Sequence, residues 1–225
     1  MRRLIVLRPE PGASATVERA RAIGLDALAM PLFKIEPVAW ELPDPGMFDA
    51  LLLTSANALE YGGAGLVQLR KLPVYAVGKA TAAAAHDAGF EGAGFGNGGV
   101  EQVLATIPGD LRLLHLCGQH RMAIAARQAI TAVPVYCAVA LPPSADLAHI
   151  AGQTVAVHSP RAGQRLAELV DAARIDRATI RIAAISEAAA DAAGAGWGRI
   201  EAAATPEDSA LLALAARLCD SPETI

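Results

Sequence analysis

Four positively charged residues in this sequence lie at positions where they do not stabilise the expected helices, which makes them the first candidates for ligand binding. Each follows a short apolar run and comes at or near the expected start of a helix: Arg8, Lys79, Arg121 and Arg161. The N-terminus of a helix carries a partial positive charge, so a cation there does not stabilise the helix. Small residues stand at the same turns, where backbone N–H groups can approach an anion closely: Ser55, Gly78, Gly118, Ser159 and Ser186. The pattern predicts an anion-binding rim, although ordinary solvated charges would also explain the cations.

The elements that would position these residues follow a pattern that occurs twice. The first copy, residues 51–89, has an apolar run, a small-residue turn and a helix, then a second apolar run and an alanine-rich helix. The second copy, residues 155–194, repeats this order. Short buried strands that alternate with helices are typical of parallel βαβ units, whose ligand sites lie beyond the carboxyl ends of the strands. We therefore predict an α/β fold with parallel sheets and helices on both faces.

Two extended segments divide the chain. Residues 28–40 and 134–141 contain prolines that rule out a continuous helix. They predict a two-stranded β connector between two lobes, with residues 1–36 and 140–225 forming a discontinuous lobe 1 and residues 37–139 forming lobe 2. We expect a ligand cleft between the lobes. Within lobe 2 we also predict helices at 100–107 and 122–130 and a strand at 111–116.

The composition excludes several classes of protein. In 225 residues, 53% are hydrophobic and 19% are charged, which is typical of a packed globular protein. A net charge of −4 argues against nucleic-acid or anionic-membrane partners, and no run is long and apolar enough to span a membrane. Three cysteines, too few and too far apart for a disulfide framework, indicate a cytoplasmic protein.

The sequence contains no known motif that supplies a catalytic nucleophile or binds a catalytic metal ion. Cys117 and His120 form a pair that is too small for a zinc site, so no metal is predicted. Glycines at 94, 96 and 99 match the spacing of a dinucleotide fingerprint without following a clear strand. We interpret that stretch as a flexible loop, and a nucleotide-dependent Rossmann enzyme stays an alternative. Helix caps are the simplest explanation for Ser55, Thr81 and Ser159.

An ordered set of motifs gives a more specific indication. Residues 51–58 (LLLTSANA), 76–82 (AVGKATA), Val135-Tyr136 and His158-Ser159-Pro160 resemble, in this order and spacing, the uroporphyrinogen-III synthase family. The resemblance covers nearly the whole chain and implies two α/β lobes joined by a two-stranded ladder. It implies a cofactor-free hydro-lyase that acts on hydroxymethylbilane, a linear octacarboxylate tetrapyrrole. Such an enzyme expels the terminal hydroxyl, inverts the last pyrrole ring through a spiro intermediate and closes the ring to uroporphyrinogen III.

The resemblance also implies roles for individual residues. Tyr136 matches the tyrosine that helps the hydroxyl leave, and five residues match positions that line the substrate site: Ser55, Gly78, Thr81, Gly118 and Ser159. The cation argument adds Arg8, Lys79, Arg121, Arg161 and the turn residue Ser186 as substrate-binding residues.

The chain departs from the family at two places. Leu7 stands where the family often has threonine, and Ser186-Glu187 stands where it often has Gly-x-x-Thr. Glu187 puts a carboxylate where an anion should dock. A divergent member of low activity and a non-catalytic two-lobed protein that binds a carboxylated ligand are therefore alternatives. We expect a monomer.

Overall fold

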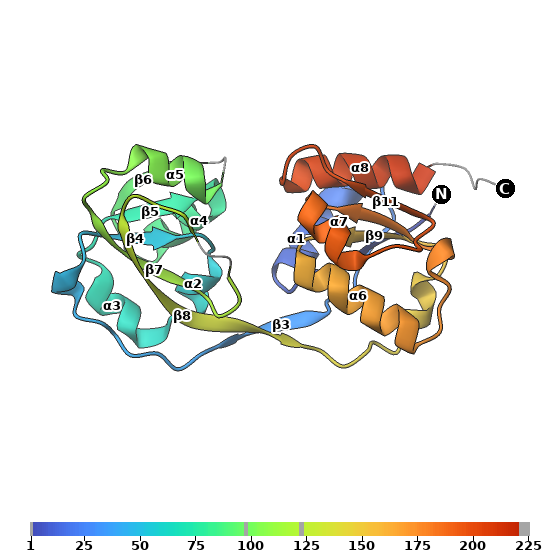
Figure 1. Ribbon diagram of the computed structural model, residues 1–225, viewed down its shortest axis with the longest axis horizontal. Helices are drawn as coiled ribbons and strands as arrows, with labels where there is room; N and C mark the ends of the chain where they lie inside the picture. The colour runs from blue at the N-terminus through green and yellow to red at the C-terminus, as the bar shows by residue number, and fades with distance from the viewer. Residues whose placement is uncertain (1, 97–98, 122–123, 221–225) are drawn as a thin grey trace. The chain divides into compact units, whose positions relative to one another are not determined.

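The chain folds into two compact units that are connected twice. The computed structural model describes residues 2–96, 99–121 and 124–220. Unit 1 comprises Met1–Lys34 and Ala140–Ile225, and unit 2 comprises Ile35–Val139. The chain leaves unit 1 within strand β3 (Phe33–Pro37) and returns at the end of strand β8 (Ala129–Ala140), and these two strands are neighbours in one sheet (Figure 1).

Hydrogen bonds on either side of the crossing show how β3 and β8 run. The Val38 N–H donates to the Val135 carbonyl at 3.0 Å, and the Leu141 N–H donates to the Leu32 carbonyl at 2.9 Å. The residue numbers rise on one strand as they fall on the other, so the two segments are antiparallel. A two-stranded connector is thus confirmed, whereas the exact domain boundaries and the cleft between the lobes stay predictions.

Unit 1 contains a five-stranded parallel sheet in the order β11-β10-β9-β1-β2. Its strands are β1 (Leu4–Val6), β2 (Ala27–Ala29), β9 (Thr154–Val157), β10 (Arg181–Ala184) and β11 (Arg199–Ala202). Three of them, β1, β9 and β10, are buried along their whole length. Continuous burial is typical of parallel strands covered by helices on both faces, and it is why these runs are almost uniformly apolar.

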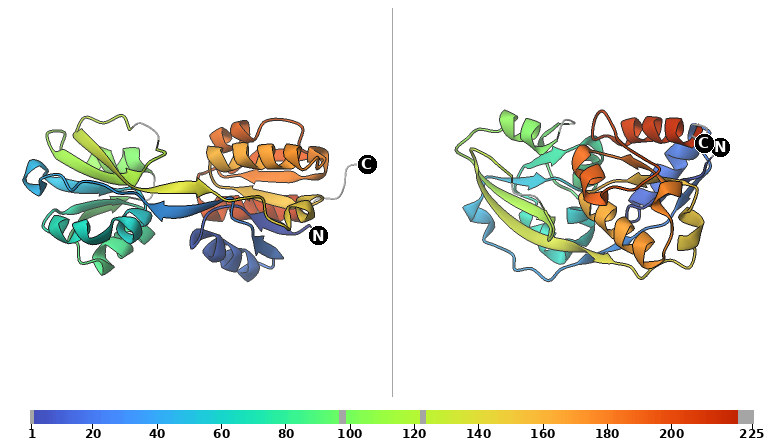
Figure 2. Two further views of the ribbon diagram at one scale, coloured as in Figure 1. Left: turned by 90° about the horizontal axis from the view of Figure 1, so that it is seen from below. Right: turned by 45° about the vertical axis from the view of Figure 1, so that its right-hand side comes forward.

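Helices cover both faces of this sheet. Helices α1 (Gly12–Ala22) and α8 (Asp208–Asp220) pack on one face, in a core with residues of β1, β2, β9 and β10. Helices α6 (Pro160–Ala172) and α7 (Glu187–Ala193) cover the other face, on the opposite side of the strands from α1 (Figure 2). At Gly163 the helices α6 and α7 approach so closely that a Cβ would lie 2.7 Å from the Ala189 carbonyl oxygen.

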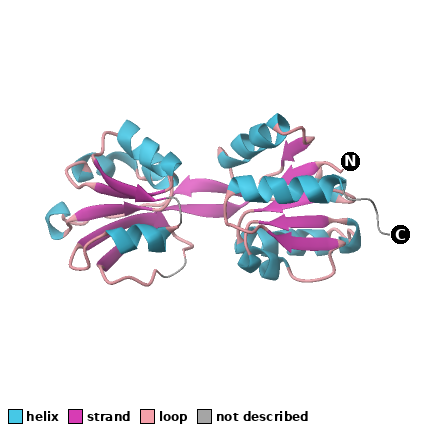
Figure 3. Cartoon of the chain, turned by 90° about the horizontal axis from the view of Figure 1, so that it is seen from above, coloured by secondary structure: helices cyan, strands magenta, loops and turns pink. Residues whose placement is uncertain are grey.

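Unit 2 contains a six-stranded sheet in the order β3-β8-β7-β4-β5-β6. Its other strands are β4 (Ala50–Leu53), β5 (Val74–Val77), β6 (Gly92–Gly96) and β7 (Arg112–Gly118). One face packs against α2 (Asn57–Tyr61), α3 (Leu66–Leu69) and α4 (Lys79–Asp87), and the other packs against α5 (Val100–Thr106). Figure 3 shows the strands as a layer between helices. The predicted fold class is therefore confirmed, with parallel sheets and helices on both faces.

Short 3-10 helices complete the structure: η1 (Pro45–Met47), η2 (Gly63–Gly65), η3 (Leu147–Ile150) and η4 (Arg177–Thr179). Among the residues that the structure describes, no helix has both the length and the apolar character needed to cross a membrane.

Two local predictions in unit 2 were wrong. The helix expected at 122–130 is not formed over its described part, because residues 124–128 are irregular and β8 begins at Ala129. Gln128 turns inward instead, and its amide donates to the Leu104 and Ile107 carbonyls at the end of α5. The glycine stretch expected to be a flexible loop forms edge strand β6 as far as Gly96. Residues 97–98 and 122–123 lie outside the described part of the chain.

Candidate functional site

In unit 2, three predicted site residues meet at the carboxyl ends of neighbouring strands. Ser55 follows β4, Gly78 follows β5 and Gly118 is the last residue of β7. Because these strands are consecutive in the sheet and parallel, their carboxyl ends share one edge. This edge is where open parallel sheets bind ligands.

Tyr136 reaches the same edge from β8 because the strand pairing is irregular there. Cys117 is paired with Pro134, but the next residue, Gly118, is paired with Tyr136, so the register shifts by one residue. Such irregularities re-aim side chains and are common next to active sites. An ideal Cβ on Gly118 would lie 2.9 Å from Cε2 and 3.2 Å from the hydroxyl oxygen of Tyr136. The tyrosine ring therefore occupies the space that a side chain at position 118 would need.

Two neighbours of the Tyr136 hydroxyl group, the Ser55 side chain and the backbone of Gly118, act on its pKa through hydrogen bonding. Burial raises the pKa of Tyr136, while these two hydrogen bonds act in the opposite direction because they favour the phenolate. The phenol consequently keeps its proton at neutral pH. Its oxygen is nevertheless held by partners that would stabilise the negative charge left when that proton is given away.

A second group of side chains lies at the ends of the same strands. Nε2 of His115 is 3.1 Å from the Thr54 hydroxyl oxygen, and the Cys117 thiol donates to the Val133 carbonyl at 3.6 Å. The charge of Arg121 acts on both His115 and Cys117. Burial, together with the charge of Arg121, lowers the pKa of His115 to about 4, so this histidine is neutral at pH 7. Burial raises the pKa of Cys117. Neither residue is thus an ion or a nucleophile at neutral pH, and Arg121 is the charged member of this group.

The first turn of α4 carries the other predicted residues of unit 2. Gly78 precedes the helix with a φ of 86°, a conformation that L residues rarely adopt, and exposed Lys79 is the first helical residue. Thr81 is buried within the turn, and no side chain caps the N-terminus of this helix. The interpretation of Thr81 as a cap was therefore wrong. The exposed cation at the helix start was correctly placed.

In unit 1, Arg8 belongs to a cluster that also contains Thr16, Arg19, His158 and Asp208. The Asp208 carboxylate accepts hydrogen bonds from Thr16 at 3.0 Å, from Nε of Arg19 at 2.8 Å and from Nε2 of His158 at 3.1 Å. Arg8 lies 3.6 Å from the same carboxylate. We call these five residues the Asp208 cluster. It joins the ends of β1 and β9 to α1 and to the first residue of α8.

The protonation states within this cluster follow from its hydrogen bonds. Burial alone would raise the pKa of Asp208, but the hydrogen bonds from His158, Arg19 and Thr16 and the charge of Arg19 hold it well below its usual range. The His158 side chain is 8% exposed, and its Nδ1 has no hydrogen-bond partner within the part of the chain that is described. In the described part of the chain, His158 therefore contacts the cluster through Nε2.

The remaining predicted residues of unit 1 stand at helix starts. Ser159 caps α6 by accepting from the Ala162 N–H at 3.2 Å, and Ser186 caps α7 by accepting from the Ala189 N–H at 3.3 Å. The guanidinium carbon of Arg161 lies 4.8 Å from the centre of the Phe33 ring, a cation–π contact. Glu187 is in the first turn of α7, where its charge favours the helix. The cap interpretation of Ser159 is confirmed.

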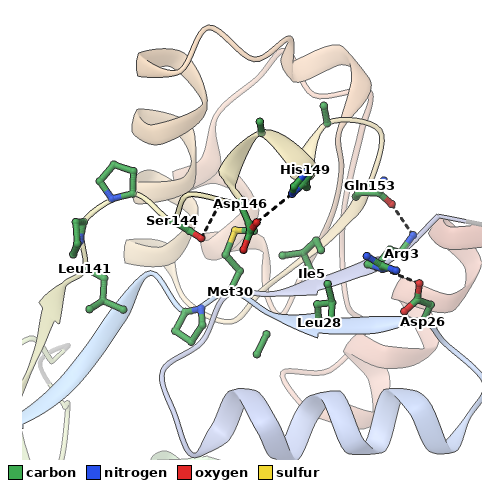
Figure 4. Close-up of a pocket in the computed structure, with 16 residues that line it drawn as sticks. Arg3, Ile5, Asp26, Leu28, Met30, Leu141, Ser144, Asp146, His149 and Gln153 are labelled. Carbon is green, nitrogen blue, oxygen red and sulfur yellow. Dashed lines mark hydrogen bonds and ion pairs between the residues drawn. The ribbon is translucent and has the colours of Figure 1, made fainter.

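A groove of about 1140 Å³ in unit 1 lies away from these residues (Figure 4). It is lined by Ile5 of β1 and Leu28 of β2, and four of its polar side chains are paired as Arg3 with Asp26 and His149 with Asp146. Among the described residues that line it, none is a predicted site residue.

Comparison with known proteins identifies the family. The family model described as uroporphyrinogen-III synthase HemD matches residues 14–213. The chain belongs to the uroporphyrinogen-III synthase family. The solved uroporphyrinogen-III synthetase of Helicobacter pylori 26695 is similar to it, with 18% identity, a TM-score of 0.62 and coverage of 97% of this chain and 100% of that one.

A selenomethionine form of a mutant uroporphyrinogen III synthase from the extremely thermophilic bacterium Thermus thermophilus has 17% identity, a TM-score of 0.55 and coverage of 98% and 100%. Comparison with curated proteins gave no match. The two structures support the fold. The family belongs to porphyrin biosynthesis, and its enzymes act on a tetrapyrrole. A non-catalytic binding protein is not favoured.

Sequence reasoning missed most of the polar residues that surround the predicted ones. Asp208 begins a helix, where a carboxylate is already explained by the helix dipole, so nothing signalled its contacts with α1 and β9. Thr16 and Arg19 stand inside α1 as ordinary helical residues. For His115 the one available signal was a polar residue in the middle of an apolar strand.

Proposed function

We propose that this chain is a lyase that converts hydroxymethylbilane into uroporphyrinogen III and water, with inversion of the last pyrrole ring. Its membership of the uroporphyrinogen-III synthase family supports the reaction. The observation that carries the proposal for this chain is the position of Tyr136 at the carboxyl edge of the sheet of unit 2. Its phenol is protonated and lies beside Ser55 and the backbone of Gly118.

In this proposal Tyr136 acts as the general acid. It gives its proton to the terminal hydroxyl of hydroxymethylbilane, the carbon–oxygen bond breaks and water leaves, while Ser55 and the Gly118 backbone stabilise the phenolate. The cationic methylene carbon then bonds to the substituted α-carbon of the last pyrrole ring, which gives the spiro intermediate. The older bond from that α-carbon to its methylene breaks, the methylene bonds to the free α-carbon of the same ring, and that carbon loses a proton. That proton returns to the phenolate, so Tyr136 ends the cycle as it began.

The substrate's carboxylates require groups that bind anions without reacting. In unit 2 we assign this role to the turn residues Ser55, Gly78, Thr81 and Gly118, and to the cations Lys79 and Arg121. In unit 1 we assign it to Arg8, Ser159, Arg161 and Ser186. Helix N-termini at Gly78, Ser159 and Ser186 support the assignment, because their N–H groups and dipoles favour negative charge.

Two departures from the family pattern bear on activity. Leu7 is fully buried, so it offers a ligand no polar group in place of the family's threonine. Glu187 adds a negative charge at the start of α7. We propose that the other anion-binding groups suffice despite these changes. The cytoplasmic location, the monomeric state and the lack of a cofactor stay predictions.

The test is an assay with enzymatically generated hydroxymethylbilane in which the type I and type III products are separated. The wild-type chain is expected to yield type III, whereas uncatalysed closure yields type I. Tyr136→Phe should lower kcat roughly 10²- to 10⁴-fold, the usual contribution of a general acid, with little change in KM. Tyr75→Phe, in β5 of the same sheet, is the matched control and should leave kcat unchanged.

Exclusively type I product from the wild-type chain would refute the function. An unchanged kcat in Tyr136→Phe, with type III product still formed, would refute only the role of the tyrosine.

A further inference from the structure

The Asp208 cluster is built around a single carboxylate with donors on all sides. Oδ1 accepts from Thr16 and His158 and is the atom nearest Arg8, while Oδ2 accepts from Arg19. Thr16 in turn accepts from Arg8 at 3.4 Å and from Arg19 at 3.1 Å. Three of the roughly four acceptor sites of Asp208 are therefore used by the protein itself, so the carboxylate serves mainly to hold groups of this chain.

Arg8 is held in a different way from the other members. Its distance of 3.6 Å from Asp208 is longer than the 2.8 Å and 3.1 Å distances of Arg19 and His158. Within the described part of the chain, Arg8 contacts Thr16 and Asp208 through Nη1. Its side chain is 36% exposed. The rest of the guanidinium group therefore keeps N–H donors for another acceptor.

The Arg8 side chain also packs against Gly12. An ideal Cβ on Gly12 would lie 2.5 Å from Nε and 2.8 Å from Cζ of Arg8. The guanidinium group thus rests directly on the first turn of α1, where any larger residue would displace it. Asp208 and Thr16 hold one end of the group, and Gly12 leaves the space for its body.

The charges of the cluster do not balance. Two guanidinium groups, those of Arg8 and Arg19, face the one carboxylate of Asp208, so the cluster has an excess of positive charge. Burial lowers the pKa of Arg8, the charge of Asp208 opposes this, and the like charge of Arg19 adds to it. A further anion at Arg8 would relieve this excess of positive charge.

We propose that Asp208 and Gly12 are positioning residues that fix the guanidinium group of Arg8, and that they thereby set where a carboxylate of the substrate binds at the carboxyl edge of the sheet of unit 1. The inference rests on the proposed function insofar as Arg8 binds the substrate. Asp208 does not touch the ligand. It acts by holding the cation that does.

The test is a double-mutant cycle on the binding of uroporphyrin III, a stable octacarboxylate related to the product, measured by fluorescence titration of the full chain. Arg8→Ala should weaken binding roughly ten- to a hundredfold, the range for a charged hydrogen bond. Asp208→Asn and Gly12→Ala should each weaken it about fivefold, a coupling typical of residues in one network. In an Arg8→Ala background both of these changes should have less than about a twofold effect.

The cycle separates positioning from structural damage. Asp208→Asn lowers stability by loosening α8, so thermal unfolding is followed in parallel and binding is measured well below the transition. Gly12→Ala leaves every charge in place and meets a flexible side chain, so it tests the position of Arg8 alone. Asp26→Asn is the matched control, because it breaks an exposed pair with Arg3 beyond the amino end of β2.

Equal losses with and without Arg8 would overturn the proposal, because Asp208 would then act through the fold. Tighter binding in Asp208→Asn would also overturn it, because Asp208 would then compete with the ligand for Arg8. Steady-state assays with hydroxymethylbilane add a second readout, in which a positioning role raises KM and leaves kcat nearly unchanged. Failure of the wild-type chain to form type III product would refute the proposed function. The double-mutant cycle on uroporphyrin III binding would still decide the role of Asp208.

Discussion

Replacing Gly118 with alanine should disable Tyr136 without removing its hydroxyl group. The Cβ added at position 118 would stand 2.9 Å from Cε2, 3.1 Å from Cζ and 3.2 Å from the hydroxyl oxygen of Tyr136. Carbon atoms in contact are normally about 3.5–4.0 Å apart, so the ring must move by roughly 0.6–1.1 Å. The strand backbone need not move, because the clash falls on the outer part of a side chain.

A shift of that size has a predictable effect on catalysis. It stretches the hydrogen bonds from Ser55 and the Gly118 backbone, and a misplacement of about 1 Å costs up to roughly 10²-fold in rate. We therefore expect kcat to fall about 10- to 100-fold with little change in KM. Stability should change little, because alanine is favoured over glycine in a strand by about 0.5–1 kcal/mol and this offsets part of the strain.

The assay is single-turnover and steady-state formation of type III product, with thermal unfolding measured in parallel. Gly92→Ala is the control, because it also lies in a strand of unit 2 and its Cβ would meet nothing within 4 Å. If alanine acts through the hydroxyl group, Gly118→Ala combined with Tyr136→Phe should be no worse than Tyr136→Phe alone. Full activity in a folded Gly118→Ala variant, or additive losses in the double variant, would refute this reasoning.

Three further predictions concern stability. Because the pKa of His115 is about 4 in the fold and about 6.5 when unfolded, its contribution is present above pH 6.5 and lost as the pH falls toward 4. Between pH 7 and pH 5, the free energy of unfolding in urea should therefore fall by about 2 kcal/mol more in the wild type than in His115→Gln. An equal pH dependence of that free energy in the two proteins would contradict the prediction. Gly163→Ala should destabilise by about 1–3 kcal/mol in thermal unfolding because of the clash with the Ala189 carbonyl, although helix propensity alone predicts a gain of about 1 kcal/mol. Gln128→Leu leaves two carbonyls at the end of α5 without their buried donor and should cost about 1–3 kcal/mol in chemical denaturation, with exposed Gln102→Leu as a neutral comparison.

The parts of the fold that could be predicted are those in which burial dictates residue type over a short run. Strands such as Leu4–Val6 and Thr154–Val157 are covered on both faces, so they show as apolar runs followed by small residues and a helix. Ser159 could be predicted as a helix cap for the same reason, because the hydrogen bond that it makes is local.

The failures in secondary structure involve partners that are distant in the sequence. Residues 124–130 are rich in helix-favouring alanine, yet Gln128 binds the end of α5 and Ile130 packs beside that helix, so tertiary contacts override propensity. Strand β6 forms from glycines because β5 offers a pairing edge, which no local pattern reveals. The shift of register that brings Tyr136 opposite Gly118 likewise depends on two strands at once.

In the proposed mechanism the carboxyl edges of the two sheets have different roles, and the difference has a physical reason. A general acid must hold its proton until the leaving group takes it, and Tyr136 does so because it is buried beside neutral partners, the Ser55 hydroxyl and a backbone group. A guanidinium group in that position would lower the pKa of the phenol and weaken its hold on the proton before the substrate arrives. Carboxylates of the substrate need the opposite environment, which the Asp208 cluster supplies in unit 1 with two guanidinium groups around one carboxylate. In the proposed mechanism, variants of Tyr136 and Gly118 should therefore act mainly on kcat, because they change the general acid, and variants of Arg8 and Asp208 should act mainly on binding, because they change a cation that binds the substrate.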